Sequence, residues 1–203
     1  IVSYLLSFGI SQKYGVRLYQ QYKSFAMSKL TENPYILCMQ KGLTFLDADR
    51  VAKALKFPLK SPLRFKYACF HVLKNKESYG DTGMELQKFG YDLYDLLKID
   101  GYTKEEINND VCDLVHSGDL KILRLPEMEG QYVFTQTMYR KEEELAELMC
   151  SISCEPADTK EAEKLLDYIA CTDRINLGKD QKNAILTSLT YPLTVIDGGP
   201  GTG

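Results

Sequence analysis

An internal repeat is the feature of this 203-residue chain that most constrains how it folds. The segment Phe8-Gly9-Ile10-Ser11 aligns with Lys41-Gly42-Leu43-Thr44, an offset of 33 residues. A small residue, an arginine and an apolar residue then recur in step, namely Gly15, Arg17 and Leu18 in the first copy and Ala48, Arg50 and Val51 in the second. Each copy has the pattern of two helices joined by a turn led by glycine. The sequence therefore predicts tandem helical hairpins, with helices over residues 2–7, 12–22, 35–39 and 45–55 and a connecting helix over 24–31 that stops before Pro34.

The charge is divided unevenly along the chain. Residues 1–76 carry 13 Lys/Arg and 3 Asp/Glu, which is +10, and residues 77–203 carry 12 and 25, which is −13. The two parts sum to the net charge of −3. A basic block of this size indicates a polyanionic partner for the hairpins. The alternative is a solvated basic surface without a partner.

The hairpins resemble the helix-hairpin-helix motif of DNA-binding proteins. There the apolar turn residue plugs into the helix pair, and N–H groups at the start of the second helix face a DNA phosphate. The family prefers Gly-apolar-Gly, whereas Ser11 and Thr44 replace the second glycine here. The resemblance implies backbone contact with single-stranded or junction DNA, without sequence reading. It assigns that contact to Gly9, Ser11, Lys13, Arg17, Lys41, Gly42, Thr44, Arg50 and Lys53. The alternative is that the hairpins are rigid spacers packed on another domain.

The middle of the chain has the order of a winged helix. Its pattern predicts helices over 64–78, 91–98 and 103–117 and then a β-hairpin with strands over 120–125 and 131–135. The third helix begins with a Thr103–Glu106 capping box. This helix carries an excess of acidic residues over Lys104, which disfavours insertion into a DNA groove and favours a structural or protein-contact role. The acidic residues are Glu105, Glu106, Asp110 and Asp113.

The end of the chain has the pattern of a phosphate-binding loop. An amphipathic helix is expected over 180–189 and a buried strand over 193–197. The strand runs into Gly198-Gly199-Pro200-Gly201-Thr202-Gly203, the G-x-x-x-x-G frame of a Walker A loop without its Lys and Ser/Thr. Backbone N–H groups of such a loop cradle phosphate oxygens. We therefore expect a fragment of a larger nucleotide-driven protein. The alternative is a glycine-rich tail without function.

Together these features resemble RecD-like ATP-dependent DNA helicases, the family that includes the exodeoxyribonuclease V alpha subunit. The resemblance extends over the whole chain and is most specific at Leu177-Gly178-Lys179-Asp180-Gln181 and the loop that follows. It implies that Gln181 reads the adenine edge and that Gly198, Gly199, Gly201, Thr202 and Gly203 hold ATP with magnesium in an intact parent protein. It also implies a superfamily 1 motor that moves 5′ to 3′ on DNA in recombination and repair, with helicase or nuclease subunits as possible partners. This fragment is expected to be inactive, because the Walker A Lys is absent.

Two other functions fit parts of the sequence. The chain could be an interaction module that docks on the motor or on partner subunits without touching DNA. A small-molecule P-loop kinase would explain the tail alone.

The predicted fold is mainly α in four parts. These are tandem helix-hairpin-helix motifs over 1–60, a winged-helix-like domain over 61–153, a linker and helix over 154–176, and the first helix and strand of a P-loop α/β motor over 177–203. No apolar run is long enough for a membrane helix, so a cytoplasmic protein is expected. The six cysteines and two histidines lack the spacing of a metal site, and none is predicted.

Overall fold

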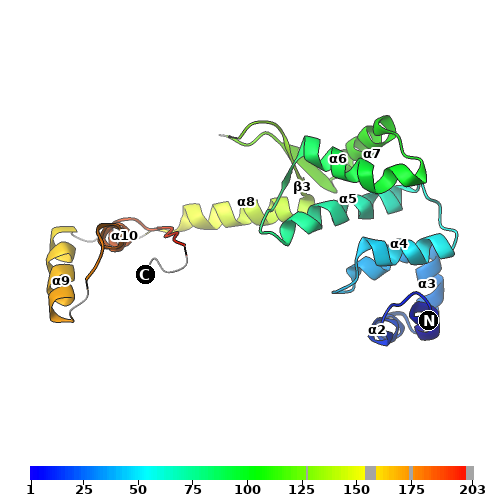
Figure 1. Cartoon of the computed structure of the whole chain (residues 1–203), viewed down its shortest axis with the longest axis horizontal. Helices are drawn as coiled ribbons and strands as arrows, with labels where there is room; N and C mark the ends of the chain where they lie inside the picture. Colours follow the sequence, from blue (N-terminus) through cyan, green and yellow to red (C-terminus); the bar gives the residue numbers. More distant parts are fainter. Residues whose placement is uncertain (127, 154–158, 174–175, 200–203) are drawn as a thin grey trace. The chain divides into compact units, whose positions relative to one another are not determined.

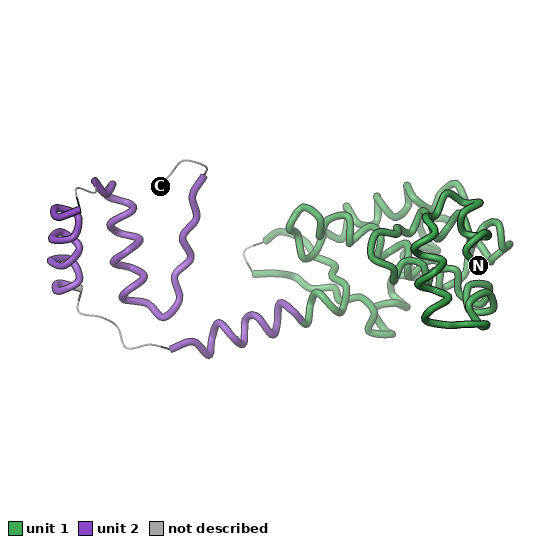
Figure 2. The backbone as a smooth tube through the Cα atoms, turned by 90° about the horizontal axis from the view of Figure 1, so that it is seen from below, with its two compact units in different colours: residues 1–140 green, residues 141–203 purple. Residues whose placement is uncertain are grey.

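The computed structural model describes residues 1–126, 128–153, 159–173 and 176–199. The chain divides into two compact units, residues 1–140 and residues 141–203, which are coloured separately in Figure 2. Each unit is described by itself.

The first unit begins with the predicted tandem hairpins (Figure 1). Its elements are α1 (Val2–Leu6), α2 (Gln12–Tyr22), η1 (Lys23–Phe25), α3 (Ala26–Glu32), η2 (Pro34–Met39) and α4 (Phe45–Ala54). All four hairpin helices are confirmed to within one or two residues, but the third is a 3-10 helix. Pro34 starts that helix, and the Asn33 side chain caps it by accepting a hydrogen bond from the Tyr35 N–H at 3.0 Å. The positive φ of 52° at Lys23 ends α2, and the predicted connecting helix forms as η1 followed by α3.

Three helices and a small sheet follow in the same unit. They are α5 (Pro62–Glu77), β1 (Met84–Glu85), α6 (Leu86–Leu97), η3 (Lys98–Asp100), α7 (Lys104–His116), β2 (Leu120–Leu123), β3 (Tyr132–Thr135) and the start of α8 (Gln136–Ser151). The predicted order of three helices and a hairpin is confirmed, and so is the capping box of α7. The turn between β2 and β3 includes Glu127, which lies outside the described residues.

The sequence analysis missed β1 and the first turn of α6. The antiparallel sheet has the order β1-β3-β2. Val133 of the central strand β3 pairs with Met84 of β1 on one side and with Ile122 of β2 on the other. Gly83 permits this pairing, because a Cβ atom there would lie 2.3 Å from the ring of Phe134. A two-residue strand has too few alternating positions for a pattern to reveal it.

One hydrophobic core joins the hairpins to the helices that follow them. Tyr35, on η2, lies at the junction and is fully buried. Its ring stacks on Phe45 of α4 at 5.7 Å and on Tyr67 of α5 at 5.5 Å between centroids. The predicted boundary near residue 60 therefore falls inside a compact unit, between parts that share buried aromatic rings.

The second unit contains α9 (Thr159–Thr172) and α10 (Lys179–Thr190), and both predicted helices are confirmed. The predicted strand over 193–197 does not form, since residues 193–199 have no regular structure. Val195 and Ile196 are 81% and 67% exposed. A parallel strand needs neighbours that accept and donate its backbone hydrogen bonds, and the described part of this unit supplies no such strand. The expected linker falls largely on residues 154–158, outside the described residues.

Across the described residues, every helix is too short or too polar to cross a membrane.

Candidate nucleic-acid interface

The turn of the first hairpin is open to solvent. Gly9 has a φ of 73°, and a Cβ atom built there would have no heavy atom within 4 Å. Ile10 is the buried plug of the turn, at 2% exposure, and its N–H donates to the Leu5 carbonyl at 3.1 Å. Ser11 is exposed, precedes α2 as its N-cap residue and makes no side-chain capping bond.

The start of α2 therefore presents unpaired donors. The N–H groups of Ser11, Gln12 and Lys13 have no acceptor among the residues that the structure describes. The first turn of α2 also contains no acidic residue. Unpaired N–H groups together with the positive end of a helix dipole make a site for an anion.

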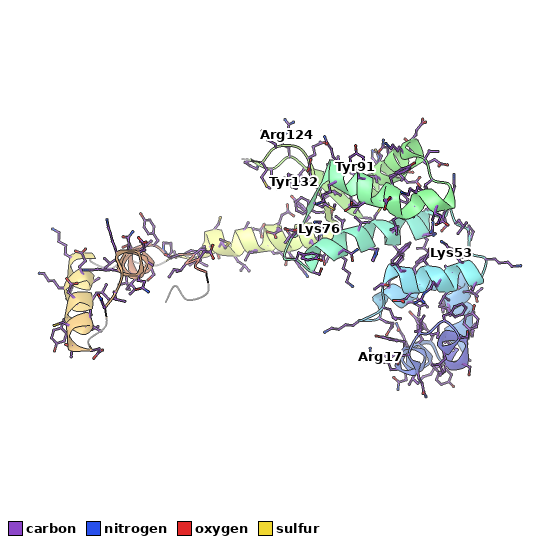
Figure 3. The ribbon with its side chains drawn as sticks, viewed as in Figure 1. Arg17, Lys53, Lys76, Tyr91, Arg124 and Tyr132 are labelled. Carbon is purple, nitrogen blue, oxygen red and sulfur yellow. The ribbon has the colours of Figure 1, made fainter. Side chains whose placement is uncertain are left out.

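Two cations lie beside these donors. Lys13 Nζ is 4.8 Å and Arg17 Cζ is 5.9 Å from the centroid of the Tyr14 ring. Both side chains are exposed and form no ion pair with the described residues. Figure 3 labels Arg17 on α2. Their full charge is therefore available to a polyanion.

The second turn, by contrast, is contacted by Tyr14 of the first hairpin, although Gly42 itself is exposed. Gly42 has a φ of 100°, and a Cβ atom there would lie 2.5 Å from the Tyr14 hydroxyl. That hydroxyl donates a hydrogen bond to the Lys41 carbonyl at 3.4 Å. Glycine is required at position 42 for its backbone conformation and for this close approach.

A carboxylate occupies the start of α4. Asp47 accepts hydrogen bonds from the Thr44 N–H at 2.9 Å and from the Thr44 hydroxyl at 2.8 Å. Arg50 Nη2 donates to the same carboxylate at 2.5 Å. Burial opposes ionisation of Asp47, but the hydrogen bonds from Thr44 and Arg50 outweigh it and lower its pKa. The Asp47 carboxylate therefore takes up the Thr44 N–H and hydroxyl that a phosphate could otherwise use.

Lys53 belongs to a buried charge network. Its ammonium lies 3.3 Å from Asp49 Oδ2 and 3.1 Å from Asp100 Oδ1. Arg64 donates from Nε and Nη2 to Asp49 at 2.7 and 3.0 Å and from Nη2 to Asp100 at 2.6 Å. Tyr35 completes the network by donating its hydroxyl to Asp49 at 2.8 Å. Figure 3 labels Lys53 on α4.

The comparison with protein families agrees with this geometry. Residues 1–83 match the model of the ATP-dependent RecD2 DNA helicase HHH domain. The matched region contains both hairpins and α5 and ends directly before β1. This part of the chain is similar to the helix-hairpin-helix region of a RecD2 helicase, which supports a helicase N-terminal region.

Within the HHH region the predicted contact residues fall into two groups. Gly9, Ser11, Lys13 and Arg17 lie together at the open first turn. At the second turn Lys41 and Gly42 are exposed, Lys41 forms no ion pair with the described residues, and Thr44, Arg50 and Lys53 are bound to carboxylates.

The sequence patterns did not single out the residues that bind or neutralise Thr44, Arg50 and Lys53. Asp47 stands three residues after Thr44, the spacing of a capping box, so a local signal was present. Arg64 and Asp100 gave no such signal, because their pairing joins distant parts of the chain.

The candidate nucleotide residues lie in the second unit. The Gln181 amide oxygen accepts a hydrogen bond from the Gly178 N–H at 2.9 Å and so helps to start α10. Gly198 and Gly199 are exposed, whereas Gly201, Thr202 and Gly203 lie outside the described residues. Among the described residues, no group of three or more His, Cys, Asp or Glu side chains is placed to hold a metal ion.

Proposed function

We propose that this chain is the N-terminal region of an ATP-dependent DNA helicase of the RecD2 kind, and that its first hairpin binds a DNA phosphate. The observation that carries the proposal is the open start of α2, with three unpaired N–H groups beside Lys13 and Arg17, in a region that matches a helicase HHH domain. Such contacts position a DNA strand and read no sequence.

The two hairpins then have different roles. The Ser11 N–H at the first turn is unpaired among the described residues, whereas the matching Thr44 N–H of the second turn already donates to the Asp47 carboxylate. A second anion there would meet like-charge repulsion. The second hairpin supports the first through the Tyr14–Lys41 hydrogen bond and is not expected to bind a DNA phosphate at Thr44.

A matched pair of substitutions tests this division. Arg17→Ala removes an unpaired cation, so we expect DNA affinity to fall several-fold. The slope of log affinity against log salt concentration should decrease by about the amount that one phosphate contact contributes. Arg50→Ala removes a cation already neutralised by Asp47, so its effect should be smaller. Fluorescence anisotropy with a labelled single strand at several salt concentrations measures both. Equal, negligible effects would leave the hairpins as scaffold only.

The segment from α5 to β3 is proposed to be a winged-helix-like domain that does not enter a DNA groove. Its third helix, α7, exposes Glu105 and Asp113. Burial, with the charges of Asp113 and Glu106, raises the pKa of Asp110, as expected for a locally negative surface. This surface favours a second candidate function, docking on a protein partner such as a motor or nuclease subunit. Absence of any salt-dependent DNA binding by the chain would favour docking as its main role.

The ATP and magnesium assignment is part of the same proposal and concerns a longer protein that completes the loop. Gln181 and the glycines from Gly198 onward would hold ATP there, as the resemblance implies. Movement 5′ to 3′, a role in recombination and repair, and a cytoplasmic location belong to this proposal too.

A substitution in that longer protein tests the adenine assignment. Gln181→Ala should raise the Michaelis constant for ATP and reduce the preference for ATP over GTP, at a cost of about 1–3 kcal/mol for an unpaired polar edge. The competing role is the cap of α10 through Gly178. In that case melting temperature would fall while nucleotide preference stayed the same.

A further inference from the structure

A cavity of about 380 Å³ lies between the second hairpin and α5. One wall comes from Leu43, Thr44 and Phe45 at the start of α4, and the other from the C-terminal half of α5. The remaining lining residues are Cys38, Tyr67, Phe70, His71, Lys74, Asn75 and Ser78. Its size falls within the range of small-molecule sites, roughly 300–1,000 Å³.

The walls are apolar and aromatic, and they are held in place by ring contacts. The Phe45 ring stacks on His71 at 5.7 Å between centroids, and Tyr67 meets Phe70 edge to face at 6.1 Å. Phe70 and Tyr67 are only half-buried. These contacts join the two walls, and the half-exposed Phe70 and Tyr67 rings offer aromatic surface to a ligand.

Polar groups are confined to a few positions in the lining. The Asn75 amide lies 3.4 Å from the His71 ring nitrogen, and both Asn75 and Ser78 are exposed. Burial, and secondarily the charge of Lys74, lowers the pKa of His71, so the ring is neutral at pH 7 and offers one donor and one acceptor. A flat ligand with apolar faces and a hydrogen-bonding edge matches this lining.

The charged side chain among the lining residues is a lysine, which favours an anionic ligand, while the Asp47 carboxylate stays bound to Thr44. Lys74 is exposed at the lining, and no Asp or Glu is among the lining residues. Lys41 precedes the wall formed by Leu43 and Thr44 in the sequence. Neither Lys41 nor Lys74 forms an ion pair within the described part of the chain. A nucleotide combines a flat base with a flanking phosphate on each side.

We propose that this cavity takes one unpaired base of a DNA strand, while lysines beside it contact the adjoining phosphates. The proposal rests on the proposed function, because the first hairpin holds the strand. Bases in a duplex are stacked and paired, so only an unpaired base can enter. The duplicated hairpins are thus specialised, the first for a phosphate and the second for a base.

The test compares three ligands on the full chain by fluorescence anisotropy. They are a short oligothymidylate, the same oligomer with abasic residues, and a blunt duplex of equal length. The oligothymidylate should bind about fivefold tighter than the abasic strand or more, in line with base–aromatic stacking. Equal binding of the two strands would overturn the base site and leave phosphate binding by the first hairpin intact.

Variants locate the effect. Phe70→Leu keeps an apolar wall and removes the aromatic face, and Ser78→Trp fills the mouth from an exposed position. Both should lower the affinity for oligothymidylate to that of the abasic strand and leave abasic binding unchanged. Tyr91→Leu is the control, because Tyr91 is an exposed aromatic residue of α6 outside this cavity. Loss of base preference in Tyr91→Leu, with retention in both cavity variants, would place the base elsewhere.

The two proposals fail differently. Arg17→Ala should weaken binding of normal and abasic strands equally, since it acts on phosphate. If no DNA ligand binds the chain at any salt concentration, both the proposed function and the proposed base site are wrong. Ser78 lies on the surface, so Ser78→Trp should have the melting temperature of the original chain. The DNA affinity of Ser78→Trp then tests the base site even if Phe70→Leu is unstable.

Discussion

Asp49 and Arg64 show how single residues decide the character of the junction between the hairpins and α5. Their side chains are 9% and 2% exposed, and each satisfies the other's charge through two hydrogen bonds. Arg64 also donates to the Leu59 carbonyl at 3.0 Å. Burial raises the pKa of Asp49 on its own, but bonds from Arg64 and Tyr35 outweigh it and lower the pKa overall. A basic residue counted toward the charge of the first block is therefore a core residue, unavailable to DNA.

Replacing Asp49 should cost far more than replacing a surface carboxylate. We expect Asp49→Asn to lower the free energy of unfolding by about 3–5 kcal/mol, because it leaves a buried guanidinium incompletely paired. Asp95→Asn is the matched control, since Asp95 pairs with Lys98 on the exposed surface, where solvent screens the pair and its loss should change stability little. Urea denaturation at pH 7 measures both. Similar small losses in the two variants would contradict the buried-pair interpretation.

The same pair sets a pH dependence of stability. The folded pKa of Asp49 lies below its usual value of 3.8, so its contribution is present above that value and is lost as pH falls through the folded pKa. The unfolding midpoint in urea should therefore fall more steeply below pH 4 in the original chain than in Asp49→Asn.

At the scale of the elements, glycines inside helices mark two different situations. Gly15 on α2 faces α1, and a Cβ atom there would lie 2.8 Å from the Val2 Cα. Gly90 lies within α6 beside a shallow groove, with no heavy atom within 4 Å of a built Cβ. Helix propensity alone predicts the same gain in stability from alanine at both positions, whereas packing leaves room for a Cβ atom only at Gly90.

Alanine at these two positions should have opposite effects. Gly90→Ala should stabilise the chain by roughly 0.5–1 kcal/mol through helix propensity. Gly15→Ala should destabilise it by about 1–3 kcal/mol, because the α1–α2 contact must open against backbone. Thermal unfolding followed by circular dichroism compares them. A stabilising Gly15→Ala would show that α1 moves away freely, and that the hairpin is not a rigid unit.

For the whole molecule, charge is distributed between the two units. Residues 141–203 carry 6 Lys/Arg and 12 Asp/Glu, which is −6, so residues 1–140 carry the remaining 19 and 16, which is +3. The unit that contains the hairpins is basic, and the other unit opposes it electrostatically at long range.

Removing the acidic unit should strengthen DNA binding at low salt. A chain of residues 1–140 is expected to bind a single strand more tightly than the full chain at about 50 mM salt, with the difference shrinking near 500 mM as screening shortens the range of charge. Anisotropy titrations of both chains provide the measurement. Weaker binding by residues 1–140 would instead assign part of the DNA contact to residues 141–203.

The hairpins, the capping box of α7 and the helices α9 and α10 follow from the sequence alone, because each depends on residues within one or two turns of each other. The pairing of Lys53 with Asp100 and of Arg64 with Asp49 was decided only by tertiary structure, which joins positions 47 and 15 residues apart. The strand expected over 193–197 does not form, because a strand needs hydrogen-bonding partner strands and the local sequence does not contain them. Local pattern determined both Gly-led turns and the Asp47 carboxylate that binds Thr44 at the second one. Packing between distant segments decided the contact of Tyr14 with Lys41 and Gly42, because these residues meet only when the two hairpins fold together.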